Sequence, residues 1–187
     1  EFLEFLYLLT VADIRSTKAD LWNDWKDSLL KKLFYKTKDH LQSGKTELPN
    51  INQQIETIKQ SVAIEVQRQG YEVNEIENLF ATLPKDYFLR YEIDEILWHL
   101  GVVIKCQDQE VVVASKISEY NVVDVFVCSK DSKGLFFRLV SIIEKLGLDI
   151  VDAKILTTKD HKVYNTISIL QDRMFEQINI NQEIEDE

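Results

Sequence analysis

The spacing of hydrophobic residues changes near the middle of this chain. Up to about residue 105, large apolar side chains recur every three or four positions, which is the spacing of one face of a helix. After residue 110 the apolar residues are mostly β-branched, and several runs alternate with polar residues, which is typical of strands. The pattern therefore predicts an α+β protein with a helical N-terminal half followed by a sheet.

The helical half is divided by polar and turn-forming residues. Asp20 is of a type that accepts hydrogen bonds from the first free amides of a helix, and it precedes the periodic positions Trp22, Trp25, Leu29 and Leu33. The predicted helices cover residues 2–13, 21–41, from Asn50 or Asn52 to Gly70, 75–83 behind an Asn74 cap, and a last segment from 94 to about 105.

The second half predicts a small unit of strands around one helix. The predicted elements are strands over 111–115 and 122–128, a helix over 135–146, and strands over 148–158 and 163–170. From residue 122 onward the order is β-α-β-β, the front of a ferredoxin-like βαββαβ unit. The residues after Leu170 are too few for a closing helix and strand, so the unit is predicted to be incomplete. The polar run 107–110 marks the predicted boundary between a helical domain, 1–106, and a second domain, 107–187.

Composition restricts the class of partner. The 187 residues carry a net charge of -10, which argues against a surface for nucleic acid or an anionic membrane. The longest apolar stretch, 96–104, is too short to span a bilayer, and no signal peptide follows Glu1. Two unpatterned cysteines, Cys106 and Cys128, indicate reduced thiols. The protein is predicted to be cytoplasmic.

Asp13 is the first candidate for chemistry. It shares a helical face with Phe2, Phe5, Leu6 and Leu9, and a carboxylate on an apolar stripe needs a partner. One interpretation pairs Asp13 with a basic group or with backbone amides near the helix end. The other makes it a ligand of a hard divalent cation, which prefers oxygen donors.

The loop before the 135–146 helix is the second candidate. Gly134 allows the backbone to come close to a bound group, and the helix that begins at Leu135 offers free amides suited to a carboxylate. Asp131 is placed to receive an amino group or to cap the helix. Local turn chemistry explains both residues equally well. His99, on the 94–105 helix, is predicted to be a packed, hydrogen-bonded histidine rather than a ligand.

Two stretches of the helical half resemble a known family. Leu-Leu-Thr-Val-Ala-Asp-Ile-Arg at 8–15, then Leu-Trp-Asn-x-Trp-Lys at 21–26, is similar to the end of the HD-type phosphohydrolase domain in bifunctional PII uridylyltransferase/uridylyl-removing enzymes. Tyr-Phe-Leu-Arg at 87–90 and the Trp-His pair at 98–99 extend the match.

In that family the enzyme transfers UMP from UTP to the PII signalling protein and removes it by hydrolysis, using Mg or Mn. The resemblance implies that Asp13 is the last metal ligand of the HD site. The chain contains no His-Asp pair, so it holds no complete catalytic set and is expected to be an inactive interior fragment by itself.

The second half resembles the first ACT domain, an amino-acid-sensing module, of the same enzymes. The resemblance lies in Val-Phe-Val-x-x-x-Asp-x-x-Gly-Leu-Phe at 125–136, in Asp-Ala-x-Ile-x-Thr at 152–157, and in a later strand with Asn165-Thr166. It implies a glutamine site formed by Asp131, Ser132, Lys133, Gly134 and Leu135. ACT ligands commonly lie between two copies, and an open sheet edge allows self-association. The alternative is a non-catalytic amino-acid-binding ACT regulatory module.

Overall fold

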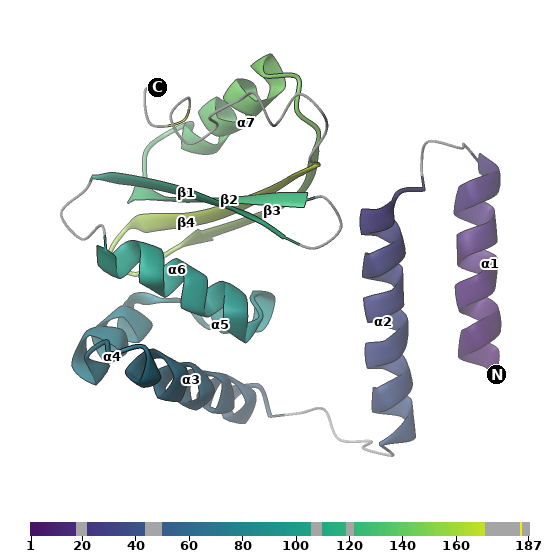
Figure 1. The fold of residues 1–187 in the computed structure, drawn as a ribbon, viewed down its shortest axis with the longest axis horizontal. Coiled ribbons are helices and arrows are strands. Elements are labelled where there is room, and N and C mark those ends of the chain that lie inside the picture. Colours follow the sequence, from purple (N-terminus) through teal and green to yellow (C-terminus); the bar gives the residue numbers. More distant parts are fainter. Residues whose placement is uncertain (18–21, 44–49, 106–109, 119–121, 171–183, 185–187) are drawn as a thin grey trace. The chain divides into compact units, whose positions relative to one another are not determined.

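The computed structural model describes residues 1–17, 22–43, 50–105, 110–118, 122–170 and 184. The chain forms two compact units, one with α1 and α2 and the other with every described element from α3 onward (Figure 1). The elements are α1 (Phe2–Thr17), α2 (Asp24–Gln42), α3 (Ile51–Arg68), α4 (Val73–Thr82), α5 (Lys85–Arg90), α6 (Ile93–Lys105), β1 (Val111–Ile117), β2 (Val122–Lys130), α7 (Leu135–Lys145), β3 (Ile150–Thr157) and β4 (Lys162–Leu170). The predicted boundary at 106–107 falls outside the described residues.

The first unit is a pair of helices. Asn23 is the N-cap of α2, and its side chain accepts a hydrogen bond from the Lys26 amide at 2.9 Å. The predicted Asp20 cap is therefore wrong as the start of this helix, and residue 20 itself lies outside the described part. The helices meet through the rings of Tyr7 and Phe34, whose centroids are 5.0 Å apart.

The apolar stripe of α1 faces solvent. Phe2, Phe5 and Leu9 are 84 %, 71 % and 68 % exposed, and α1 contains no buried residue. On α2, Leu29 and Leu33 are also exposed. Period alone predicts which residues share a helical face, but burial requires a neighbouring element that covers the face.

The helices α3 to α6 form a layer with its own buried residues. Asn50 caps α3 by accepting hydrogen bonds from two amides, which settles the predicted choice between Asn50 and Asn52. Helix α4 begins after Glu72 without a side-chain cap, so Asn74 lies inside the helix and the predicted cap there is wrong. The layer buries Val62, Ile76, Phe88 and Ile96, among others.

The described sheet has the strand order β1-β2-β4-β3, and each neighbouring pair is antiparallel. The predicted β-α-β-β series is present as β2, α7, β3 and β4, and β1 adds a fourth strand beside β2. The expectation of an incomplete ferredoxin-like α+β unit is confirmed for the described elements. Strands β1 and β3 are the outer strands of this sheet.

Both faces of the sheet are covered (Figure 1). Val123, Val125 and Val127 of β2 pack with α7 in one core. Phe126 and Cys128, on the alternate face, join the core of the helical layer. A strand that is buried on both faces reads as a continuous apolar run, which explains the composition of β2. None of the helices in the described ranges combines the length and apolar character that a membrane span requires.

Candidate functional site

The loop before α7 is held in shape from two sides. Gly134 is the N-cap of α7 and has a φ of +80°, a left-handed conformation that favours glycine. Arg138, from the first turn of α7, donates to the Lys133 carbonyl at 3.1 Å and to the Ser132 hydroxyl at 2.9 Å. On the other side, the Asp131 amide donates to the carbonyl of His161 in the β3–β4 turn at 2.9 Å. The loop is therefore fixed relative to both the helix and the sheet.

The carboxylate of Asp131 does not cap the helix. The cap residue is Gly134, and among the described residues no side chain bonds to the first amides of α7. Within the described part of the chain, the Asp131 side chain has no hydrogen bond or ion pair. The Leu135 amide donates to the Ser132 carbonyl at 3.1 Å. The next amides of a first helical turn have no partner inside their own helix, so Phe136 and Phe137 offer donors and a partial positive charge beside a free carboxylate.

A cavity of about 450 Å³ opens beside this loop. It is lined by the residues that precede and begin α7, by two residues of β3 and by two of β4. These are residues 131–137, Ile155, Thr157, Val163 and Asn165. The five residues predicted from the sequence, 131–135, all line this cavity. We call it the loop cavity; that its residues bind a ligand remains a prediction.

Asn165 is the residue that distinguishes the loop cavity from an ordinary turn. Its side chain is 1 % exposed, and its Oδ1 atom has no hydrogen-bond partner in the described structure. A buried polar atom without a partner costs about 1–3 kcal/mol, and such atoms are rare in folded proteins. Asn165 also lines the loop cavity, so its amide side chain lies next to that space.

The sequence did not single out Asn165, Ile155 or Thr157 as site residues. They reach the cavity through strand pairing, in which Ile155 of β3 lies opposite Asn165 of β4. The available signal was the amide side chain of Asn165 within the mostly apolar run from Val163 to Leu170.

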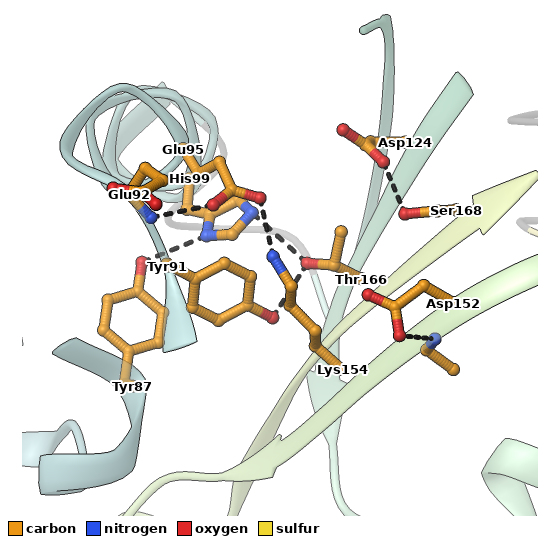
Figure 2. Close-up of polar contacts among 11 residues, drawn as sticks. Tyr87, Tyr91, Glu92, Glu95, His99, Asp124, Asp152, Lys154, Thr166 and Ser168 are labelled. Carbon is orange, nitrogen blue, oxygen red and sulfur yellow. Dashed lines mark hydrogen bonds and ion pairs between the residues drawn. The ribbon is translucent and has the colours of Figure 1, made fainter. Parts of the chain in front are cut away.

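On the opposite face of the sheet, His99 joins α6 to the strands (Figure 2). The side chain is fully buried, with Nδ1 at 3.1 Å from the Tyr87 hydroxyl and Nε2 at 3.3 Å from the Thr166 hydroxyl. Its ring stacks on Phe126 with centroids 4.2 Å apart. Burial, helped by nearby lysines, lowers the pKa of His99 to about 3. The prediction of a packed, hydrogen-bonded histidine is confirmed, and the imidazole is neutral at pH 7.

A second contact joins the same layers. Lys154 of β3 donates to a carboxylate oxygen of Glu95 on α6 at 2.8 Å, and both side chains are mostly buried (Figure 2). The Lys154 ammonium also lies 4.6 Å from the centre of the Tyr91 ring. Because Ile155 follows Lys154 along β3, one strand borders the loop cavity on one face and the helical layer on the other.

Comparison with known proteins gives the helical layer and the sheet separate matches. The family model described as "Uridylyltransferase GlnD fifth domain" matches residues 50–101, which hold α3 to α5 and most of α6. A model described as "Plant bHLH transcription factor, ACT-like domain" matches residues 110–186 and therefore the sheet and α7.

Curated relatives match across both parts. Proteins named "Bifunctional uridylyltransferase/uridylyl-removing enzyme" from Vibrio campbellii and Vibrio parahaemolyticus are 35 % and 34 % identical over 172 residues, which is 91 % of this chain. The protein of that name from Vibrio cholerae is 34 % identical over the same length. The chain is a homologue of these bifunctional uridylyltransferase/uridylyl-removing enzymes. It spans about a fifth of their length, since the match covers 20 % of each.

In the first unit, Asp13 is the residue predicted to be a metal ligand. Asp13 is exposed, and its backbone carbonyl accepts hydrogen bonds from the hydroxyls of Ser16 and Thr17, both at 2.9 Å. Among the described residues, no group of three or more His, Cys, Asp or Glu side chains is placed to hold a metal. These residues alone do not form a divalent-metal site, so no metal-dependent step is assigned to them.

Proposed function

We propose that this chain is the glutamine-sensing regulatory part of a bifunctional uridylyltransferase/uridylyl-removing enzyme of nitrogen regulation, acting in the cytoplasm. The observation that carries the proposal is the unpaired, buried Oδ1 atom of Asn165, a residue that lines the loop cavity. The match to an ACT-like family model over the same residues supports it.

The chemistry of the loop cavity suits a free amino acid with an amide side chain. The amides of Phe136 and Phe137, in the first turn of α7, are placed to receive the α-carboxylate, because the start of a helix favours negative charge. Asp131 carries a carboxylate for the α-ammonium group. Asn165 Oδ1 then accepts a hydrogen bond from the side-chain amide of glutamine. Glutamate has no donor at that position, so it would leave the oxygen unpaired, and sites of this kind discriminate strongly.

The first experiment is calorimetric titration of the chain with glutamine, with glutamate as the control ligand. Glutamine is expected to bind and glutamate to bind much more weakly. Gly134→Val should abolish binding, because its φ of +80° strains a branched residue and reshapes the loop. Gly147→Val is the matched control: it has a φ of +70° at the far end of α7, where it should cost stability but leave binding intact. Equal binding of the two amino acids would contradict the proposal.

In the whole enzyme, we propose that UMP passes from UTP to the PII signalling protein and is removed by hydrolysis, with glutamine as the effector. Asp13 supplies the last ligand of an HD-type site that takes Mg²⁺ or Mn²⁺, and the other ligands come from elsewhere in the enzyme. The chain alone should therefore release no UMP from uridylylated PII protein in the presence of either metal. Release of UMP by the isolated chain would contradict this assignment.

The outer strands offer a route to self-association. An exposed strand presents unpaired backbone groups that pair readily with another strand. We propose that two copies associate through an outer strand, β1 or β3, which would bring two loop cavities into one assembly. Sedimentation with and without glutamine measures this directly. The free-standing regulatory module predicted as an alternative is less favoured, because the relatives that match 91 % of the chain are named as enzymes.

A further inference from the structure

A second cavity, of about 270 Å³, lies in the helical layer and is bordered by the β3–β4 turn. Four of its apolar lining residues are at most 7 % exposed. These are Ile55, Phe80, Leu83 and Phe88. Three lysines from separate parts of the chain also line it: Lys59 of α3, Lys85 of α5 and Lys159 of the β3–β4 turn. We call it the lysine cavity.

Two of the three lysines are bonded to neutral oxygens. Lys85 Nζ donates to the side-chain oxygen of Asn52 at 2.8 Å, and Lys159 Nζ donates to the Ala81 carbonyl at 2.8 Å. Among the described residues, neither has a carboxylate partner. An ammonium group has three donors, so both retain donors for a further acceptor.

The third lysine is the one with an acidic partner. Lys59 Nζ lies 3.3 Å from a carboxylate oxygen of Glu56, which also lines the cavity, and 5.2 Å from the centre of the Phe88 ring. The charged lining therefore consists of three ammonium groups and one carboxylate. Glu56 holds Lys59 in place but leaves the cavity with an excess of positive charge.

The excess of positive charge around the lysine cavity contrasts with the composition of the whole chain. The sequence holds 32 acidic and 22 basic residues, so carboxylates are abundant as partners for lysine. Ammonium groups around one cavity repel one another, and the repulsion is stronger beside a low-dielectric apolar surface than in water. An anion between these groups would lower the repulsion.

We infer that the lysine cavity binds a small organic dianion, either a dicarboxylate or a compound with a phosphate group. The ammonium groups would take the charged ends, and the apolar side chains would contact the carbon skeleton. The shared chemistry is a double negative charge on a molecule small enough for about 270 Å³. This inference concerns a separate cavity and does not rest on glutamine binding.

The test is calorimetric titration of the chain, at low ionic strength, with inorganic phosphate and separately with succinate. Uncharged succinamide serves as the control ligand. At least one dianion is expected to bind saturably with a Kd of about 1 mM or tighter. Lys85→Gln and Lys159→Gln should each weaken that binding by about tenfold or more, because each removes one attractive charge.

Lys145→Gln is the matched control, since it makes the same charge change at the last residue of α7, away from the lysine cavity. It should leave binding unchanged. Lys159→Arg keeps the charge and the donors and should retain binding, which separates loss of charge from loss of fold. Binding of phosphate alone identifies a phosphate compound, and binding of succinate alone a dicarboxylate. No binding of either anion, or equal weakening by Lys145→Gln, overturns the inference.

Discussion

Asn165 and Thr166 are neighbours on β4, yet they face opposite layers of the protein. Asn165 lines the loop cavity beside α7. Thr166 is hydrogen-bonded to His99 and accepts a hydrogen bond from Tyr91 at 3.0 Å, both in the helical layer. Since successive side chains of a strand point to opposite faces, one strand carries both the candidate site and its attachment to the helices.

Asn165→Val should remove ligand binding without reducing stability. The variant replaces a buried, unpaired oxygen with an apolar group suited to a strand, so the free energy of unfolding is expected to stay constant or rise by about 1 kcal/mol. Glutamine binding should fall below detection by calorimetry. Thr166→Val is the matched control on the other face: it should lower the unfolding free energy by about 1–3 kcal/mol and leave glutamine binding intact. The reverse pattern would exclude Asn165 from the site.

The stability of the chain should fall as the pH drops from 7 to 5. Folded His99 has its pKa lowered to about 3, whereas the unfolded residue titrates near 6.5, so in this range the unfolded state binds more protons. The contribution of His99 is fully present above pH 6.5 and is lost progressively toward pH 3. Denaturant unfolding should show a loss of about 2 kcal/mol from this residue between pH 7 and pH 5.

Histidine substitutions separate the contribution of His99 to the pH dependence of stability from that of other groups. His99→Gln is expected to be less stable at pH 7, because it loses the stacking on Phe126, but its stability should depend much less on pH. His161→Gln, at an exposed position in the β3–β4 turn, should keep the slope of the parent chain. An unchanged slope in His99→Gln would show that other groups cause the pH dependence.

Lys154→Met should destabilise the contact between α6 and β3. Glu95 is 17 % exposed, and loss of its partner leaves a mostly buried carboxylate without a counter-charge. The expected loss of unfolding free energy is about 1–2 kcal/mol, between the values for exposed and fully buried pairs. Adding Glu95→Gln should recover part of it. Arg90→Gln, which removes an exposed ion pair with Asp86, should cost at most about 0.5 kcal/mol.

Arg138→Gln should make the loop before α7 more mobile without lowering the stability of the fold. The guanidinium bonds to Lys133 and Ser132 from an exposed position, so the unfolding free energy should change by less than about 1 kcal/mol. Hydrogen exchange at the loop amides should become faster, and glutamine should bind more weakly. Arg68→Gln, which removes an exposed pair with Glu65, should alter neither measurement. Unchanged exchange in Arg138→Gln would show that the loop is held from the sheet side alone.

Helix ends show how far local chemistry predicts structure. Asn50 caps α3 as its residue type predicts. Gly147, directly after the predicted helix over 135–146, has a φ of +70°, a left-handed conformation that suits a glycine at a helix end. Asn74 has the same capping chemistry as Asn50 but lies inside α4, because this helix begins at Val73, one residue before Asn74. A residue can cap a helix only if the packing of the whole segment places it at the end.

The sequence by itself determined the α+β order, the approximate bounds of the described elements other than α5, and the five residues 131–135 at the start of α7. These follow from period, from β-branching and from glycine, all of which act over a few neighbouring residues. Only the tertiary structure decided that Asn165 borders this loop, that Lys59, Lys85 and Lys159 share a cavity, and that the apolar stripe of α1 faces solvent. These features depend on strand register and on which elements cover each face, and both are set by contacts between residues far apart in the chain.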